Sequence, residues 1–133
     1  ILRELVGSYL KRDIAESNIQ DQDKFYRLLL LLAHQTGSLV NVNELSRILK
    51  LSVTAIDNYL YVMRKCFHIH LLPPFHSSIR KELTKMPKVY FNDLGLRNAL
   101  VNYYAPLESR NDKGLLLENY VFQLLMTVLF QFP

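Results

Sequence analysis

The residues of this chain that could bind a metal ion are four histidines and a single cysteine. His68 and His70 stand two positions apart in an apolar segment, so a β-strand there would project both imidazoles from one face. Two imidazoles do not complete a zinc site, and the spacing of Cys66 and His76 does not bring either residue to them. No acidic residue lies close to them in the sequence, so we predict no metal site.

Covalent or nucleotide chemistry has little support in the residue types. Cys66 follows Lys65, and a neighbouring cation favours the reactive thiolate, but a lone cysteine beside an apolar helix is more typical of a small core residue. The glycines are isolated and form no phosphate-binding loop: Gly7, Gly37, Gly95 and Gly114. We therefore predict neither a catalytic residue nor a cofactor within these residues.

Polar and basic residues in the middle of the chain have the types and spacing of a nucleic-acid interface. Thr54, Asn58 and Tyr61 recur at helical spacing, and their side chains can hydrogen-bond to base edges in the major groove. Phosphate contacts would come from nearby cations: Lys65, Arg80, Lys81 and Lys85. Asp57 lies among these outward positions and would repel phosphate, so a protein-contact module stays open as the alternative.

The elements that must position these residues follow from apolar periodicity. Residues 1–14 predict an amphipathic helix and residues 15–22 a polar connection. Asp21 or Asp23 is the predicted N-cap of a strongly apolar helix, which Gly37 ends.

Two shorter helices follow, joined by a tight turn. Asn41 or Asn43 caps the first and Ser52 caps the second. Their inward-facing residues are predicted at helical spacing: Leu45, Ile48 and Leu49, then Val53, Ile56, Leu60 and Met63. A longer helix followed by two helices across a short turn predicts a helix-turn-helix arrangement.

A basic hairpin comes next. Phe67, Ile69 and Leu71 alternate with other side chains as in a strand, and a double proline interrupts the run. The return strand is predicted at residues 89–91, after Pro87. Three helices and such a hairpin predict a winged helix over residues 23–91.

The last part of the chain returns to helix. Asp93 is the predicted cap of one helix, and residues 115–132 form another. In the latter, one residue in four is polar and nearly all the rest are apolar, so the helix should be buried. Glu118 and Gln123 argue against a membrane span. Because so large an apolar surface needs cover, we predict a homodimer through residues 115–132.

Composition agrees with a folded cytoplasmic fragment. The chain has 133 residues, of which 50% are hydrophobic and 21% charged. One cysteine suits a reducing compartment, and a net charge of +4 permits contact with nucleic acid without requiring it. The chain opens at Ile1 with no signal pattern, and it has the features of an excised piece of a larger protein.

Two blocks near the end of the chain carry a family resemblance. They are PKVYFNDLGL at residues 87–96 and GLLLEN at residues 114–119. Together with residues 9–14, 25–37 and 43–60, they resemble the C-terminal region of prokaryotic P-loop ATPases of the AAA-like and archaeal-ATPase-like kind. That region is a domain of unknown function.

The resemblance implies a parent chain with an N-terminal ATPase domain that binds ATP and Mg²⁺. It also implies that the winged helix is followed by a domain similar to the PD-(D/E)XK nuclease fold. Glu118 matches the glutamate on the first helix of that fold. A glutamate at a helix N-terminus, stabilised by the helix dipole, is the alternative role for this residue.

We therefore expect a mainly α fragment: a winged helix-turn-helix with a β-hairpin wing, followed by the incomplete start of an α/β nuclease-like domain. Residues 1–22 would be a connecting helix and linker, residues 23–91 the winged helix, and residues 92–133 the truncated domain. The expected function is that of an accessory region of a P-loop ATPase, which binds duplex DNA or couples nucleotide state to a partner. The alternatives are the front part of a nuclease domain and a protein-interaction module.

Overall fold

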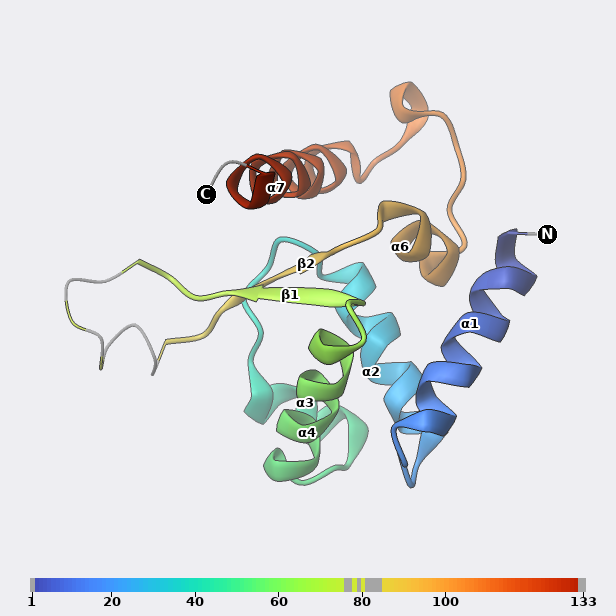
Figure 1. Cartoon of the computed structure of the whole chain (residues 1–133), viewed down its shortest axis with the longest axis vertical. Helices are drawn as coiled ribbons and strands as arrows, with labels where there is room; N and C mark the ends of the chain where they lie inside the picture. Colours follow the sequence, from blue (N-terminus) through green and yellow to red (C-terminus); the bar gives the residue numbers. More distant parts are fainter. Residues whose placement is uncertain (1, 76–77, 79, 81–84, 132–133) are drawn as a thin grey trace.

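The computed structural model describes residues 2–75, 78, 80 and 85–131, and among these it is mainly helical with a small antiparallel sheet (Figure 1). The elements follow one another as α1 (Leu2–Glu16), α2 (Gln22–His34), α3 (Val42–Leu49), α4 (Val53–Lys65), β1 (Ile69–Leu72), β2 (Lys88–Phe91), α6 (Leu94–Val101), the 3-10 turn η1 (Leu107–Ser109) and α7 (Lys113–Gln131). In Figure 1, α7 lies on the opposite side of the two strands from α3 and α4.

Side-chain caps begin four helices at predicted residues, and the structure selects Asp21 rather than Asp23 and Asn41 rather than Asn43. Asp21 accepts a hydrogen bond from the backbone N–H of Lys24, and Asn41 accepts one from Glu44. Ser52 and Asp93 do the same at α4 and α6. Each cap satisfies a backbone donor that the first helical turn leaves without a partner.

The core lies between α2, α4 and the sheet. The fully buried side chains of α2 meet those of α4 and of both strands: Phe25, Leu28, Leu29, Leu32, Ile56, Met63, Ile69, Val89 and Phe91. Two predicted core residues are on the surface, because Ile48 is 52% exposed and Val53 is 41% exposed. Helix α3 faces the core through Leu45 and Leu49 instead, and Val53 is the first residue of α4.

The sheet consists of β1 and β2 in antiparallel register, with Ile69 opposite Phe91 and Leu72 opposite Lys88. An isolated antiparallel bridge joins Leu39 to Lys88 on the other edge of β2. Gly37, whose φ of 80° suits a residue without a side chain, turns the chain from α2 into this bridge.

The alternation of side chains predicts that Phe67 belongs to the strand, but β1 begins only at Ile69. It adopts a left-handed conformation with φ of 61° and is 80% exposed. Its N–H binds the carbonyl of Arg64, and the N–H of His68 binds the carbonyl of Met63, which is the Schellman ending of a helix. Glycine is the usual residue at this position, so the ending of α4 could not be inferred from residue type.

The sequence predicts that helix α7 is buried, but most of it is exposed in the structure. Asn119 and Gln123 of its polar stripe bond to the sheet, whereas most of its apolar surface is exposed: Leu117, Tyr120, Val121, Leu124, Leu125, Val128, Leu129 and Phe130. Asn119 is fully buried, and its side-chain amide accepts from the N–H of Phe91 and donates to its carbonyl, both at 2.8 Å. An amide side chain thus completes the outer edge of β2 like a further strand residue.

Within the part of the chain that the structure describes, one helix, α7, is long enough and apolar enough to cross a membrane. One such helix is weak evidence for a span, because buried core helices of soluble proteins satisfy the same criteria. The side-chain amide of Gln123 donates to the carbonyl of Asn92, and Asn119 binds Phe91, so α7 is held on the sheet. The structure is compatible with a soluble protein, and a cytoplasmic location stays a prediction.

Candidate nucleic-acid interface

Helix α4 presents one uninterrupted polar face to solvent. Thr54, Asn58, Tyr61 and Lys65 are all exposed, and their spacing of four, three and four residues puts them in one row along the helix. The opposite face is held in the core by Ile56, Tyr59, Leu60 and Met63. The structure therefore brings these predicted residues together on a single rigid surface.

The charge of this face is mixed. Asp57 is exposed beside the row, while Arg64 and Lys65 are exposed at the C-terminal end of the helix. The turn before α4 carries a further exposed cation, Lys50, whose backbone carbonyl accepts a hydrogen bond from the ammonium of Lys24. Positive charge thus lies at both ends of the row, with one carboxylate between them.

The basic residues of the hairpin are only partly within the described residues. Arg80 and Lys85 are exposed. Lys81 lies outside the described residues, as does His76. The hairpin strands themselves run side by side and pack on the end of α4 through β1 (Figure 1).

Glu118 joins α7 to the sheet. Its carboxylate accepts a hydrogen bond from the Tyr90 hydroxyl at 2.7 Å and lies 3.3 Å from the Lys88 ammonium. The hydrogen bond from Tyr90 lowers the pKa of Glu118, with a further contribution from Lys88. Burial, together with the neighbouring Glu118, raises the pKa of Tyr90 to about 12. In this structure Glu118 thus makes a tertiary contact between α7 and β2.

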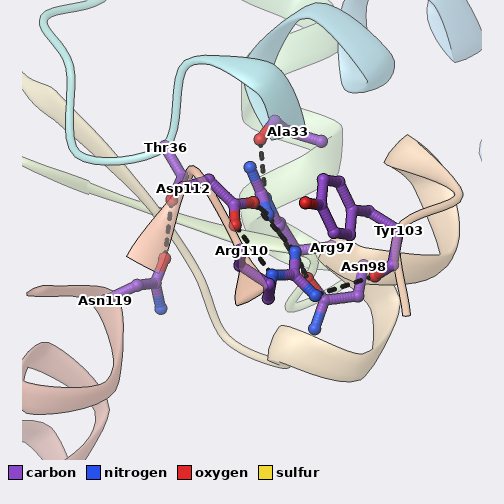
Figure 2. A network of polar contacts seen from close by, with 8 residues as sticks. All are labelled: Ala33, Thr36, Arg97, Asn98, Tyr103, Arg110, Asp112 and Asn119. Atoms are coloured by element: carbon purple, nitrogen blue, oxygen red, sulfur yellow. Dashed lines mark hydrogen bonds and ion pairs between the residues drawn. The ribbon is translucent and has the colours of Figure 1, made fainter. Parts of the chain in front are cut away.

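A second polar cluster lies where α2, α6 and the start of α7 meet (Figure 2). The side chains of Arg97 and Arg110 are 3% exposed, and both bind the carboxylate of Asp112. Arg97 also donates to the carbonyl of Ala33, at the C-terminal end of α2. Arg110 donates to the carbonyl of Tyr103 and lies 4.2 Å from the centre of its ring.

The arrangement of this cluster is structural. One carboxylate serves two buried guanidinium groups, and the hydrogen bond from Arg110 is the main reason that the pKa of Asp112 lies well below its usual range. Asp112 also accepts the first backbone bond of α7, from the N–H of Leu116. Together these contacts fix the direction in which α7 leaves η1.

A third cluster was not predicted. His68 is 2% exposed and its Nε2 lies 2.9 Å from a carboxylate oxygen of Asp13, which comes from α1, 55 residues away. Cys66 completes the group, because one ligand atom from each of the three residues lies within 4.8 Å of the others. His70 belongs elsewhere, with its ring centre 5.1 Å from that of Phe122 on α7. Because β1 begins at Ile69, His68 does not share a strand face with His70 and contacts α1 instead.

The comparisons with known proteins identify the family. The model of a domain of unknown function, DUF8612, matches residues 1–107. The chain belongs to the DUF8612 family. Its match spans α1 to the start of η1, so the face of α4 and the three residues around His68 lie inside the DUF8612 region and α7 lies beyond it. No enzyme activity is part of the family description.

One curated relative is similar to most of this chain. The uncharacterized protein MJ1637 of Methanocaldococcus jannaschii is 26% identical over 110 residues, which are 83% of this chain and 23% of that protein. The chain therefore spans about a quarter of the relative. No solved structure matches the chain.

Proposed function

We propose that this chain is an accessory DNA-binding region of a larger protein, with α4 in the major groove and the β1–β2 hairpin along the phosphates. The observation that carries the proposal is the exposed row of Thr54, Asn58, Tyr61 and Lys65 on a helix whose other face is fixed in the core. Side chains of these types can read base edges, and a rigid helix holds them at constant spacing.

The order of the elements supports a winged-helix interpretation. Helix α2 is followed by a short extended segment at Leu39, by α3 and α4 across a tight turn, and then by the antiparallel pair β1 and β2. The bridge from Leu39 to Lys88 adds that segment to the edge of β2. A helix, a bridging segment, two helices and a hairpin are the parts that a winged helix needs to dock α4 in a groove.

The parent in this proposal is a prokaryotic P-loop ATPase, as the resemblance of residues 87–96 and 114–119 implies. ATP and Mg²⁺ would bind to its N-terminal ATPase domain, which is then the first partner of this region. A G-x-x-x-x-G-K-[ST] loop upstream in the parent sequence supports this assignment, and a parent without such a loop contradicts it.

The hairpin provides the first test. Replacing Arg80, Lys81 and Lys85 together with alanine should weaken binding to duplex DNA by a similar factor on every sequence, because phosphate contacts do not read bases. The slope of log affinity against log salt should become shallower by about 0.9 for each phosphate that the variant no longer neutralises. Fluorescence anisotropy with labelled duplexes measures both quantities.

A matched control removes the same charge elsewhere. Replacing Lys11, Arg12 and Lys113 with alanine takes three exposed cations from α1 and α7. This variant should keep the wild-type salt slope, because α1 and α7 do not form the proposed surface. Equal losses of affinity in the two triple variants would show that binding depends on net charge rather than on the hairpin.

The exposed face of α7 favours a second function, protein interaction, in which the partner is a second copy of this chain. Leu117, Val121, Leu124 and Val128 are 45%, 52%, 48% and 54% exposed and follow a spacing of four, three and four residues. Leucine and valine alternating at this spacing form the seam that two-stranded helix pairs bury. A contiguous apolar surface of this kind is unusual on a soluble monomer.

If the chain self-associates through α7, one glutamate introduced into this face should dissociate the dimer. Leu124 is 48% exposed and lies within this seam, so Leu124→Glu should dissociate the dimer by burying an unpaired carboxylate while leaving the fold unchanged. Ile48→Glu places the same charge on an exposed residue of α3 and should leave the dimer intact. Sedimentation across a range of concentrations distinguishes them, and a wild-type chain that stays monomeric throughout would contradict the homodimer.

A further inference from the structure

The three residues Asp13, Cys66 and His68 form a compact set of donors that the DNA-binding proposal does not use. They supply a carboxylate, a thiol and an imidazole, and one ligand atom from each lies within 4.8 Å of the others. Two of them flank the Schellman turn at the end of α4, and the third comes from the last turns of α1. Three donors of different type therefore meet at a fixed junction between two helices.

An unpaired buried atom marks this junction. His68 is 2% exposed, and its Nε2 bonds to Asp13, but its Nδ1 is buried and has no hydrogen-bond partner among the described residues. Leaving a buried polar atom without a partner costs about 1–3 kcal/mol. The contact with Asp13 gives one ring nitrogen of His68 a partner, and the other ring nitrogen has none among the described residues.

We propose that Asp13, Cys66 and His68 bind a zinc ion. A thiolate with an imidazole and a carboxylate is a ligand set that zinc accepts, whereas magnesium and calcium prefer oxygen donors alone. Asp13 acts as a ligand in this arrangement, because its carboxylate and the Nε2 of His68, 2.9 Å apart, can both turn to a metal ion that also binds the Cys66 thiolate. Three protein donors leave a fourth position of tetrahedral zinc for water.

The surroundings of the three residues are suited to such an ion. Cys66 and His68 also line a cavity of about 450 Å³, together with Tyr9, Asp93 and Leu96. Ser17 also lies near the thiol, with its hydroxyl oxygen 3.9 Å from the sulfur of Cys66. Binding would release the thiol proton to solvent, so zinc affinity should fall in acid.

The expected consequence is a metal-dependent attachment of α1. This helix contacts α6, and the Asp13–His68 pair links it to the end of α4. Because metal binding to the folded state adds to its stability, zinc should raise the midpoint of thermal unfolding of the whole chain. An ion pair alone would give no such response.

Titration of the untagged, reduced, metal-free chain with zinc tests the proposal. Calorimetry should show one zinc per chain, and cobalt in place of zinc should give the charge-transfer absorption of a cobalt–thiolate bond. Cys66→Ser and His68→Gln should each bind zinc at least about 10-fold more weakly, and Asp13→Asn about 10–100-fold more weakly. His34→Gln removes an exposed imidazole outside the cluster and should bind like the wild type.

Two results would overturn the zinc site. One is a folded wild-type chain that shows no saturable zinc binding at micromolar concentrations. The other is zinc binding that Cys66→Ser leaves unchanged, with no cobalt–thiolate absorption in the wild type. Because the cobalt spectrum is recorded on the wild-type chain, the test holds even if a substituted chain fails to fold.

Discussion

Replacing Asp112 with alanine is expected to destabilise the fold by about 3–5 kcal/mol, because it leaves two buried guanidinium groups without a counter-charge. Arg97 and Arg110 are each 3% exposed in their side chains, so solvent cannot take the place of the carboxylate. Urea unfolding followed by circular dichroism measures the change in stability. Asp23→Ala is the control. The side chains of Asp23 and its ion-pair partner Arg27 are 70% and 65% exposed, so this pair should contribute at most about 1 kcal/mol to stability.

The same carboxylate predicts a dependence on pH. The pKa of Asp112 is lowered in the folded state, mainly by the hydrogen bond from Arg110. Its contribution is therefore fully present above the unfolded pKa of about 3.9 and is lost as the pH falls through the folded pKa. The difference in stability between wild type and Asp112→Ala should be constant near neutral pH and shrink in acid. Equal destabilisation by Asp112→Ala and Asp23→Ala would contradict this role of the arginine cluster.

Asn119→Ala is expected to cost about 2–6 kcal/mol, because it leaves the buried N–H and carbonyl of Phe91 without partners at about 1–3 kcal/mol each. The Thr36 hydroxyl, 2.7 Å from the Asn119 oxygen, loses its acceptor as well. Gln123→Ala, one turn further along the stripe, removes an exposed hydrogen bond to Asn92 and should cost less than about 1.5 kcal/mol.

Hydrogen exchange locates the effect of Asn119. The amide of Phe91 should be protected in the wild type and in Gln123→Ala, and should exchange much faster in Asn119→Ala, because its acceptor is the substituted side chain. A Phe91 amide that exchanges equally in both variants would show that Asn119 does not complete the edge of β2.

The local features of this fold could be predicted because they depend on neighbouring residues. Asp21, Asn41, Ser52 and Asp93 cap helices within three positions of their donors, so residue type and spacing predict Ser52 and Asp93 directly and restrict each of the other two caps to a pair of candidates. The outward row on α4 follows in the same way from a period of 3.6 residues.

The tertiary features could not be predicted, since their partners lie far apart in the sequence. Asp13 lies 55 residues before His68. Arg97 forms an ion pair with Asp112 and donates a hydrogen bond to the carbonyl of Ala33. The polar stripe of α7 was visible in the sequence, but polar residues are normally assigned to solvent. Here Asn119 faces inward because it replaces backbone partners at the edge of a strand.

The measurement that tests the DNA-binding proposal most directly is an NMR titration of the isotope-labelled chain with duplex DNA at about 50 mM salt. The largest changes in backbone amide shifts should lie along the exposed row of α4, at Thr54, Asn58, Tyr61 and Lys65, and should diminish as salt is added. Changes confined to the exposed face of α7, or no changes at all at this salt concentration, would contradict DNA binding by α4.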